Sequence, residues 1–146
     1  MGLASSIGLG LALAQPQLDV IVLDGDGSLL MNLGSLATIG MLQPRNLTLV
    51  VMDNEAYATT GGQATPTSRG ADLASSARAL RIEDAVTVRT EADLAARCQP
   101  GASHVPGTGP RVIVAKVDES APTVKPPLDS VGIKERFMAA IGCLAC

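Results

Sequence analysis

Apolar and polar positions along this chain alternate between two patterns. Short runs of Val, Ile and Leu, typical of strands buried on both faces, alternate with longer stretches in which apolar residues recur at helical spacing. The runs predict strands at Asp19–Asp24, Leu47–Asp53, Ala85–Val88 and Arg111–Val117. The longer stretches predict helices at Leu3–Ala14, Leu33–Leu42, Ala71–Leu80, Glu91–Cys98 and Val131–Ile141. This alternation predicts an α/β fold, a doubly wound and mostly parallel sheet with helices on both faces.

The remaining segments are predicted to be connections. Asn54 to Gly70 is a long polar loop, 99–110 is rich in proline and glycine, and 118–130 is proline-rich and extended. No internal repeat is visible. We expect residues 1–146 to form a single domain, because this length suits one core.

Composition excludes several classes of function. The net charge of −3 offers no basic surface for nucleic acid or an anionic membrane. The apolar N-terminus has no preceding basic segment and is too short to span a bilayer, so we expect a buried helix that stops at Pro16, with no cleavage and no membrane. The three cysteines fit a reducing compartment, the cytoplasm, and Cys143 and Cys146 are interpreted as a helix-end tail rather than a metal or redox site.

Polar residues follow the first two predicted strands. Asp24 and Asp26 alternate with glycines after the first strand, and Asn54 follows the second. Ligands bind beyond the carboxyl ends of the strands in such a sheet, so we expect these residues to share one rim. Asp26, Asn54 and the main-chain carbonyl of Ala56 would offer the mixed oxygen ligands that Mg²⁺ prefers.

The glycines and the serine between these acids suit a phosphate. Gly25 and Gly27 let the backbone approach closely, and Ser28 with nearby N–H groups can donate hydrogen bonds. A helix expected to start near Asn32 would direct its N-terminus inward. The rim is therefore a candidate site for a metal-bound diphosphate.

Other interpretations of the rim remain open at this point. A dinucleotide fingerprint fails, because Leu30 stands where a glycine is required. "VIVLDGDGSL" resembles the opening motif of haloacid-dehalogenase-type phosphohydrolases, with Asp24 as nucleophile and Asp26 as acid/base, but the next strand ends in Asp53 and Asn54 rather than Ser or Thr. A purely structural alternative is that Asp26 and Asn54 cap turns.

The stretch "GDGSLLMNLGSLATIGMLQPRNLTLVVMDN" resembles the thiamine-diphosphate motif, GDG followed after 25–30 residues by Asn. Nearly the whole chain is similar to the pyrophosphate-binding half of the phosphonopyruvate/sulfopyruvate decarboxylase group. The resemblance implies that Asp26, Asn54 and the Ala56 carbonyl bind Mg²⁺, while Gly27 and Ser28 contact the diphosphate. The complete set of expected cofactor contacts is Met1, Gly2, Gly25, Asp26, Gly27, Ser28, Asn54, Ala56, Thr60 and Gly61.

Two features qualify the resemblance. Glu55 replaces the glycine often found after the motif's asparagine, although the next ligand is a main-chain oxygen. Met1 and Gly2 align with the loop whose bulky apolar residue supports the bent cofactor, so we expect a truncated chain or a start site placed too late. "TTGGQATPTSRG", from Thr59 to Gly70, is interpreted as a flexible cover over the cofactor, with contacts expected from Thr60, Gly61, Gly62 and Gln63.

The resemblance also implies what this chain lacks. In the family a glutamate on a separate pyrimidine-binding domain activates the cofactor, and no residue here is expected to be catalytic. We therefore expect a β-type subunit of a thiamine-diphosphate-dependent decarboxylase (a carboxy-lyase) that is inactive without a pyrimidine-binding α-type partner, self-associates and acts on a small 2-oxo acid. His104 and Arg69 are interpreted as surface residues. A phosphohydrolase and a non-catalytic cofactor-binding fragment remain the alternatives.

Overall fold

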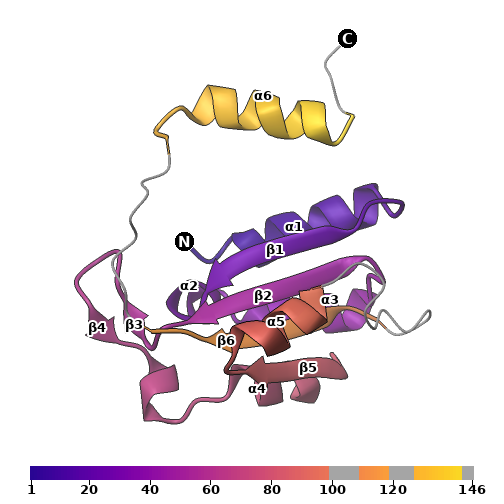
Figure 1. Cartoon of the computed structure of the whole chain (residues 1–146). Coiled ribbons are helices and arrows are strands. Elements are labelled where there is room, and N and C mark those ends of the chain that lie inside the picture. Colours follow the sequence, from indigo (N-terminus) through magenta and orange to yellow (C-terminus); the bar gives the residue numbers. More distant parts are fainter. Residues whose placement is uncertain (99–108, 119–126, 143–146) are drawn as a thin grey trace.

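A four-stranded parallel sheet forms the centre of the molecule. The computed structural model describes residues 1–98, 109–118 and 127–142, so His104, Cys143, Cys146 and most of the connections expected at 99–110 and 118–130 lie outside the described residues. The strands are β1 (Val20–Gly25), β2 (Leu47–Asp53), β5 (Asp84–Val88) and β6 (Arg111–Lys116). Their order is β1-β2-β6-β5, and every neighbouring pair is parallel (Figure 1). The predicted α/β fold is confirmed.

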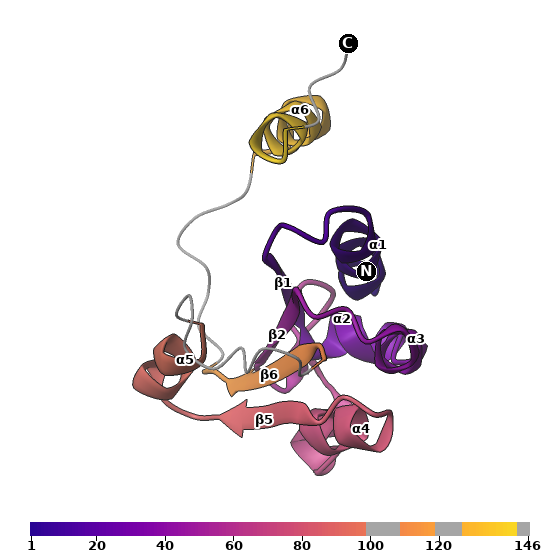
Figure 2. The same ribbon diagram turned by 90° about the vertical axis from the view of Figure 1, so that its right-hand side faces the viewer.

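Helices cover both faces of this sheet. They are α1 (Ala4–Ala14), α2 (Asp26–Met31), α3 (Gly34–Leu42), α4 (Leu73–Ala79), α5 (Glu91–Cys98) and α6 (Ser130–Ala140). Figure 2 shows α1, α3 and α4 on one side of the sheet and α5 on the other, while α6 stands apart. The predicted helices agree with these bounds to within two residues at each end, except that α2 was not predicted.

The core lies mainly between the sheet and α1, α3 and α4. Leu29, Leu36 and Ile39 are fully buried there against β1 and β2. A smaller cluster under α5 contains Val50 and Ile113 from the two central strands. Because β2 and β6 are buried on both faces, they appear in the sequence as unbroken apolar runs rather than alternating ones.

Short elements at the carboxyl ends of the strands differ from the prediction. The helix expected near Asn32 is preceded by α2, which starts at Asp26 directly after β1. The expected loop from Asn54 to Gly70 contains a two-stranded hairpin, β3 (Ala56–Tyr57) with β4 (Gln63–Ala64), and the 3₁₀-helix η1 (Pro66–Arg69). These elements are too short to show a hydrophobic period, which is why the pattern missed them.

The expectation that α1 is a buried helix is half wrong. Ser5, Leu9 and Ala12 face the core, but Leu3 and Ile7 are 60% and 66% exposed. An apolar stripe of α1 is therefore uncovered in the described chain. No helix within the described ranges is long and apolar enough to cross a membrane.

The contact between α1 and β1 requires a glycine. A Cβ built on Gly8 would stand 2.1 Å from Cγ2 of Val22, a stiff side chain that cannot move aside freely. Gly10, two residues along the same helix, has nothing within 4 Å of the equivalent position.

We therefore expect Gly8→Ala to lower the free energy of unfolding by about 1–3 kcal/mol through overpacking. Gly10→Ala should leave it unchanged or raise it by up to about 1 kcal/mol, because alanine is the better helix former. Urea unfolding of both variants measures the difference. Equal stabilities would contradict this account of the helix–strand contact.

Candidate functional site

The carboxyl ends of β1, β2 and β6 surround a cavity of about 470 Å³. This volume falls within the range of about 300–1,000 Å³ that is usual for small-molecule sites. The expected cofactor contacts that line it are Met1, Gly25, Asp26, Gly27, Ser28, Asn54 and Ala56. Segments that are 24 or more positions apart in the sequence thus meet at one rim, beyond the carboxyl ends of the parallel strands.

The other three expected contacts lie beside the cavity. The Gly2 amide donates to Oγ of Ser28 (2.9 Å) and ties the N-terminal segment to α2. Thr60 and Gly61 form the tip of the β3–β4 hairpin, where both amides donate to the carbonyl of Tyr57. Thr60 and Gly61 do not line the cavity, whereas Ala58 and Thr59 of the same turn do.

Asp26 is the buried carboxylate of the site. It is the first residue of α2 and only 1% exposed. Its Oδ2 accepts hydrogen bonds from Oγ1 of Thr65 (2.6 Å) and Oγ1 of Thr67 (3.0 Å). Within the described parts of the chain no hydrogen bond reaches Oδ1, and Asp26 lines the cavity. One oxygen is therefore engaged and the other is available to a cation.

Asn54 and Ala56, which follow the end of β2, line the same cavity. Oδ1 of Asn54 accepts a hydrogen bond from the Ala56 amide (3.2 Å), which fixes the side-chain orientation. No group of three or more His, Cys, Asp or Glu that could hold a metal occurs among the described residues. A cation at this rim would be bound by a mixed set of one carboxylate, one amide and main-chain oxygen, which suits hard Mg²⁺.

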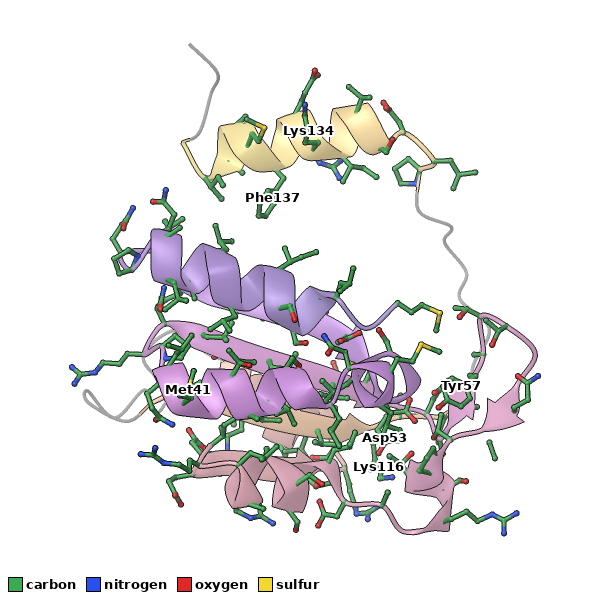
Figure 3. The ribbon with its side chains drawn as sticks, turned by 180° about the vertical axis from the view of Figure 1, so that it is seen from behind. Met41, Asp53, Tyr57, Lys116, Lys134 and Phe137 are labelled. Atoms are coloured by element: carbon green, nitrogen blue, oxygen red, sulfur yellow. The ribbon has the colours of Figure 1, made fainter. Side chains whose placement is uncertain are left out.

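A second buried carboxylate, Asp53, is neutralised by a lysine. Nζ of Lys116 lies 2.8 Å from Oδ2 of Asp53 and 2.7 Å from Oε1 of Glu55 (Figure 3). Burial disfavours the ammonium ion, but the hydrogen bonds and charges of these two acids outweigh it and raise the pKa of Lys116 above its ordinary value. The lysine therefore stays charged at neutral pH.

Glu55 adopts a conformation that favours glycine. Its φ is +62°, in the left-handed region where a side chain is strained. The departure from glycine noted in the sequence therefore has a conformational cost, and the ion pair with Lys116 offsets part of it.

Asp24 lies outside the cavity lining. Its Oδ1 accepts a hydrogen bond from the Gly25 amide (3.0 Å), and its buried Oδ2 has no hydrogen-bond partner among the described residues. A phosphohydrolase would need Asp24 and Asp26 to face one pocket, and here only Asp26, the first residue of α2, lines the cavity. The arrangement gives no support to Asp24 as a nucleophile.

Sequence reasoning missed Tyr57, Thr65 and Thr67. Tyr57 lines the cavity and packs on the glycine of the motif, because a Cβ on Gly27 would stand 2.5 Å from its ring. The polar sequence around these residues is typical of an exposed loop, so only the long-range contacts reveal their roles.

We expect Gly27→Ala to lower the free energy of unfolding by about 1–3 kcal/mol, because Tyr57 and the methyl group of Thr65 must shift. Gly25→Ala is the matched control, since nothing lies within 4 Å of its added Cβ and its φ of −96° suits any residue. It should change the free energy by no more than about 0.5 kcal/mol. Thermal unfolding that ranks the two variants in the opposite order would refute this packing.

Comparisons with known proteins agree with the geometry. The chain is 42% identical over 144 residues to sulfopyruvate decarboxylase subunit beta of Methanocaldococcus jannaschii, covering 97% of this chain and 73% of the relative. It is 44% identical to the same subunit of Methanococcus maripaludis, with 97% and 74% covered. A 68-residue segment is 54% identical to phosphonopyruvate decarboxylase of Streptomyces viridochromogenes, covering 47% of this chain and 17% of that protein.

The fold agrees with a solved structure as well. An X-ray structure from Mycobacterium smegmatis, of a protein assigned as a thiamin diphosphate-dependent enzyme, superposes with a TM-score of 0.61 at 22% identity, over 82% of this chain and 22% of that one. Residues 1–115 match the family described as thiamine pyrophosphate enzyme, C-terminal TPP binding domain. The chain belongs to this family of thiamine pyrophosphate-binding domains.

Proposed function

We propose that this chain binds Mg²⁺–thiamine diphosphate through the diphosphate and serves as the β-type half of a 2-oxo-acid decarboxylase. One observation carries the proposal: Asp26 lines one cavity together with Asn54 and Ala56, and the hydrogen bonds of its side chain within the described chain all go to Oδ2. The relatives named as decarboxylase subunits support the choice of reaction class. Sulfopyruvate and phosphonopyruvate are the substrates suggested by their names.

In this proposal the chain's residues hold the cofactor rather than react. Asp26, Asn54 and the Ala56 carbonyl bind the cation, and Gly27 and Ser28 donate hydrogen bonds to the diphosphate. Thiamine diphosphate supplies the electron sink that a 2-oxo-acid decarboxylation needs. The protein's contribution is therefore position and electrostatic complementarity.

The proton-transfer part of the site is assigned to a partner. We place the activating glutamate on a pyrimidine-binding α-type subunit, consistent with relatives named as β subunits. The uncovered apolar stripe of α1, with Leu3 and Ile7, offers surface for such an association. Self-association through the same surface is part of the proposal.

Metal-dependent binding tests the assigned ligands. Asp26→Ala should abolish calorimetrically measured binding of thiamine diphosphate in the presence of Mg²⁺, because the only charged ligand is lost. Asp24→Asn should weaken binding only modestly, since Asp24 lies outside the cavity lining. Loss of binding in Asp24→Asn alone, together with hydrolysis of p-nitrophenyl phosphate, would favour a phosphohydrolase instead.

Turnover tests whether this chain holds the cofactor while a partner subunit supplies the activating glutamate. The chain alone should decarboxylate neither sulfopyruvate nor phosphonopyruvate, and adding a pyrimidine-binding subunit should restore activity. Asn54→Ala should remove that activity, and high Mg²⁺ and cofactor concentrations should partly restore it by mass action. Decarboxylation by the purified chain alone would show that the partner is unnecessary.

Light scattering tests self-association. A monomer at tens of micromolar would count against it.

A further inference from the structure

The side chain of Asp26 accepts hydrogen bonds from neutral donors, whereas its neighbour Asp53 forms an ion pair with a lysine. Among the described residues, the ion pairs at this rim all belong to Lys116, which lies 2.8 Å from Asp53. Asp26 instead receives two hydroxyl groups on one oxygen, Oδ2. A hydroxyl fixes the direction of a carboxylate without cancelling its charge, so the attraction of Asp26 for a metal cation is retained.

The hydroxyls of Thr65 and Thr67 do not contribute equally to the orientation of Asp26. Each threonine has one hydroxyl proton. Thr65 lies 2.6 Å from Asp26, whereas Thr67 lies 3.0 Å from Asp26 and 2.8 Å from Asp53. The two threonine Oγ1 atoms also lie 2.8 Å apart. The shortest contact of Thr65 is the one with Asp26, so we assign its proton to that carboxylate, whereas the single proton of Thr67 has three possible acceptors, the two carboxylates and Oγ1 of Thr65.

Thr65 bonds to Asp26 instead of capping its own helix. Thr65 is the N-cap of η1, a position where a threonine side chain ordinarily accepts a hydrogen bond from the start of its own helix. Here it makes no such cap, and its hydroxyl reaches a residue 39 positions earlier in the chain. Thr65 is 1% exposed, and its amide donates to the carbonyl of Glu55 (2.9 Å), so its backbone is anchored as well.

We propose that Thr65, assisted by Thr67, is a positioning residue that orients Asp26 so that Oδ1 faces the diphosphate-bound cation. This inference rests on the proposed function. It goes beyond the set of metal ligands, because neither threonine is expected to touch the metal or the cofactor. The carboxylate without its hydroxyl partners would rotate and present its oxygens in variable directions.

The test compares two substitutions at one position. Thr65→Val keeps the shape of the side chain and removes the hydroxyl, whereas Thr65→Ser keeps the hydroxyl. Thr48→Val is the matched control, because Thr48 lies near the opposite end of β2 from the cavity. The 146-residue chain and each variant are titrated calorimetrically with thiamine diphosphate, in Mg²⁺ and in parallel in Ca²⁺, below the measured unfolding temperature.

Thr65→Val is expected to weaken binding in Mg²⁺ by about tenfold or more, the usual effect of losing a hydrogen bond to a charged group. Binding in Ca²⁺ should weaken far less, because Mg²⁺ demands near-octahedral ligand geometry and Ca²⁺ accepts variable directions. Thr65→Ser and Thr48→Val should bind like the wild-type chain with both ions. Thr67→Val should show a smaller loss that is again selective for Mg²⁺.

Each other outcome overturns the inference. Equal losses with both ions would show that Thr65 only supports the fold, and unchanged binding would show that Asp26 needs no orientation. If Thr65→Val does not fold, the test passes to Thr67→Val. Binding that is unchanged in this variant, or weakened equally in Mg²⁺ and Ca²⁺, then overturns the inference. A wild-type chain that binds thiamine diphosphate with neither ion would refute the proposed function itself, whereas normal wild-type binding with a normal Thr65→Val variant refutes only the role of Thr65.

Discussion

The burial of two carboxylates side by side is the constraint on which the rest of this rim depends. Asp26 and Asp53 are both almost fully buried, at the ends of adjacent parallel strands. Unpaired buried charges are costly, so each must be compensated by the surrounding groups. The chain compensates Asp53 with the ammonium of Lys116 and Asp26 with hydroxyls. That asymmetry leaves one of the two acids electrostatically available.

The elements around the rim place the groups that compensate these two carboxylates. β6 lies next to β2, and this order brings Lys116 beside Asp53. The β3–β4 hairpin returns the chain so that Thr65 pairs its amide with the Glu55 carbonyl. The 3₁₀-helix that follows places Thr67 between the two acids. A segment that is loop-like in sequence is therefore as constrained as the core.

The sequence predicted those features that depend on the spacing of apolar residues or on the position of a strand end. Apolar runs located the four strands, and the rule that ligands bind beyond strand ends predicted that Asp26 and Asn54 share one rim. It was uninformative about α2 and the hairpin, since two to six residues cannot display a period. Thr65 could not be found in this way, because its partner lies 39 positions away. Glu55 was noticed only as a departure from glycine, and its positive φ supplied the reason.

The packing of Tyr57 on the glycine motif makes the cavity wall optically distinct. The chain contains one tyrosine and no tryptophan, so its tyrosine emission arises from a single ring at this wall. Quenching of that emission would follow cavity occupancy without any label. A partner subunit that carries tryptophan would act as an energy acceptor for this lone donor. Assembly and ligand exchange could then be followed in one sample as two separate spectral signals.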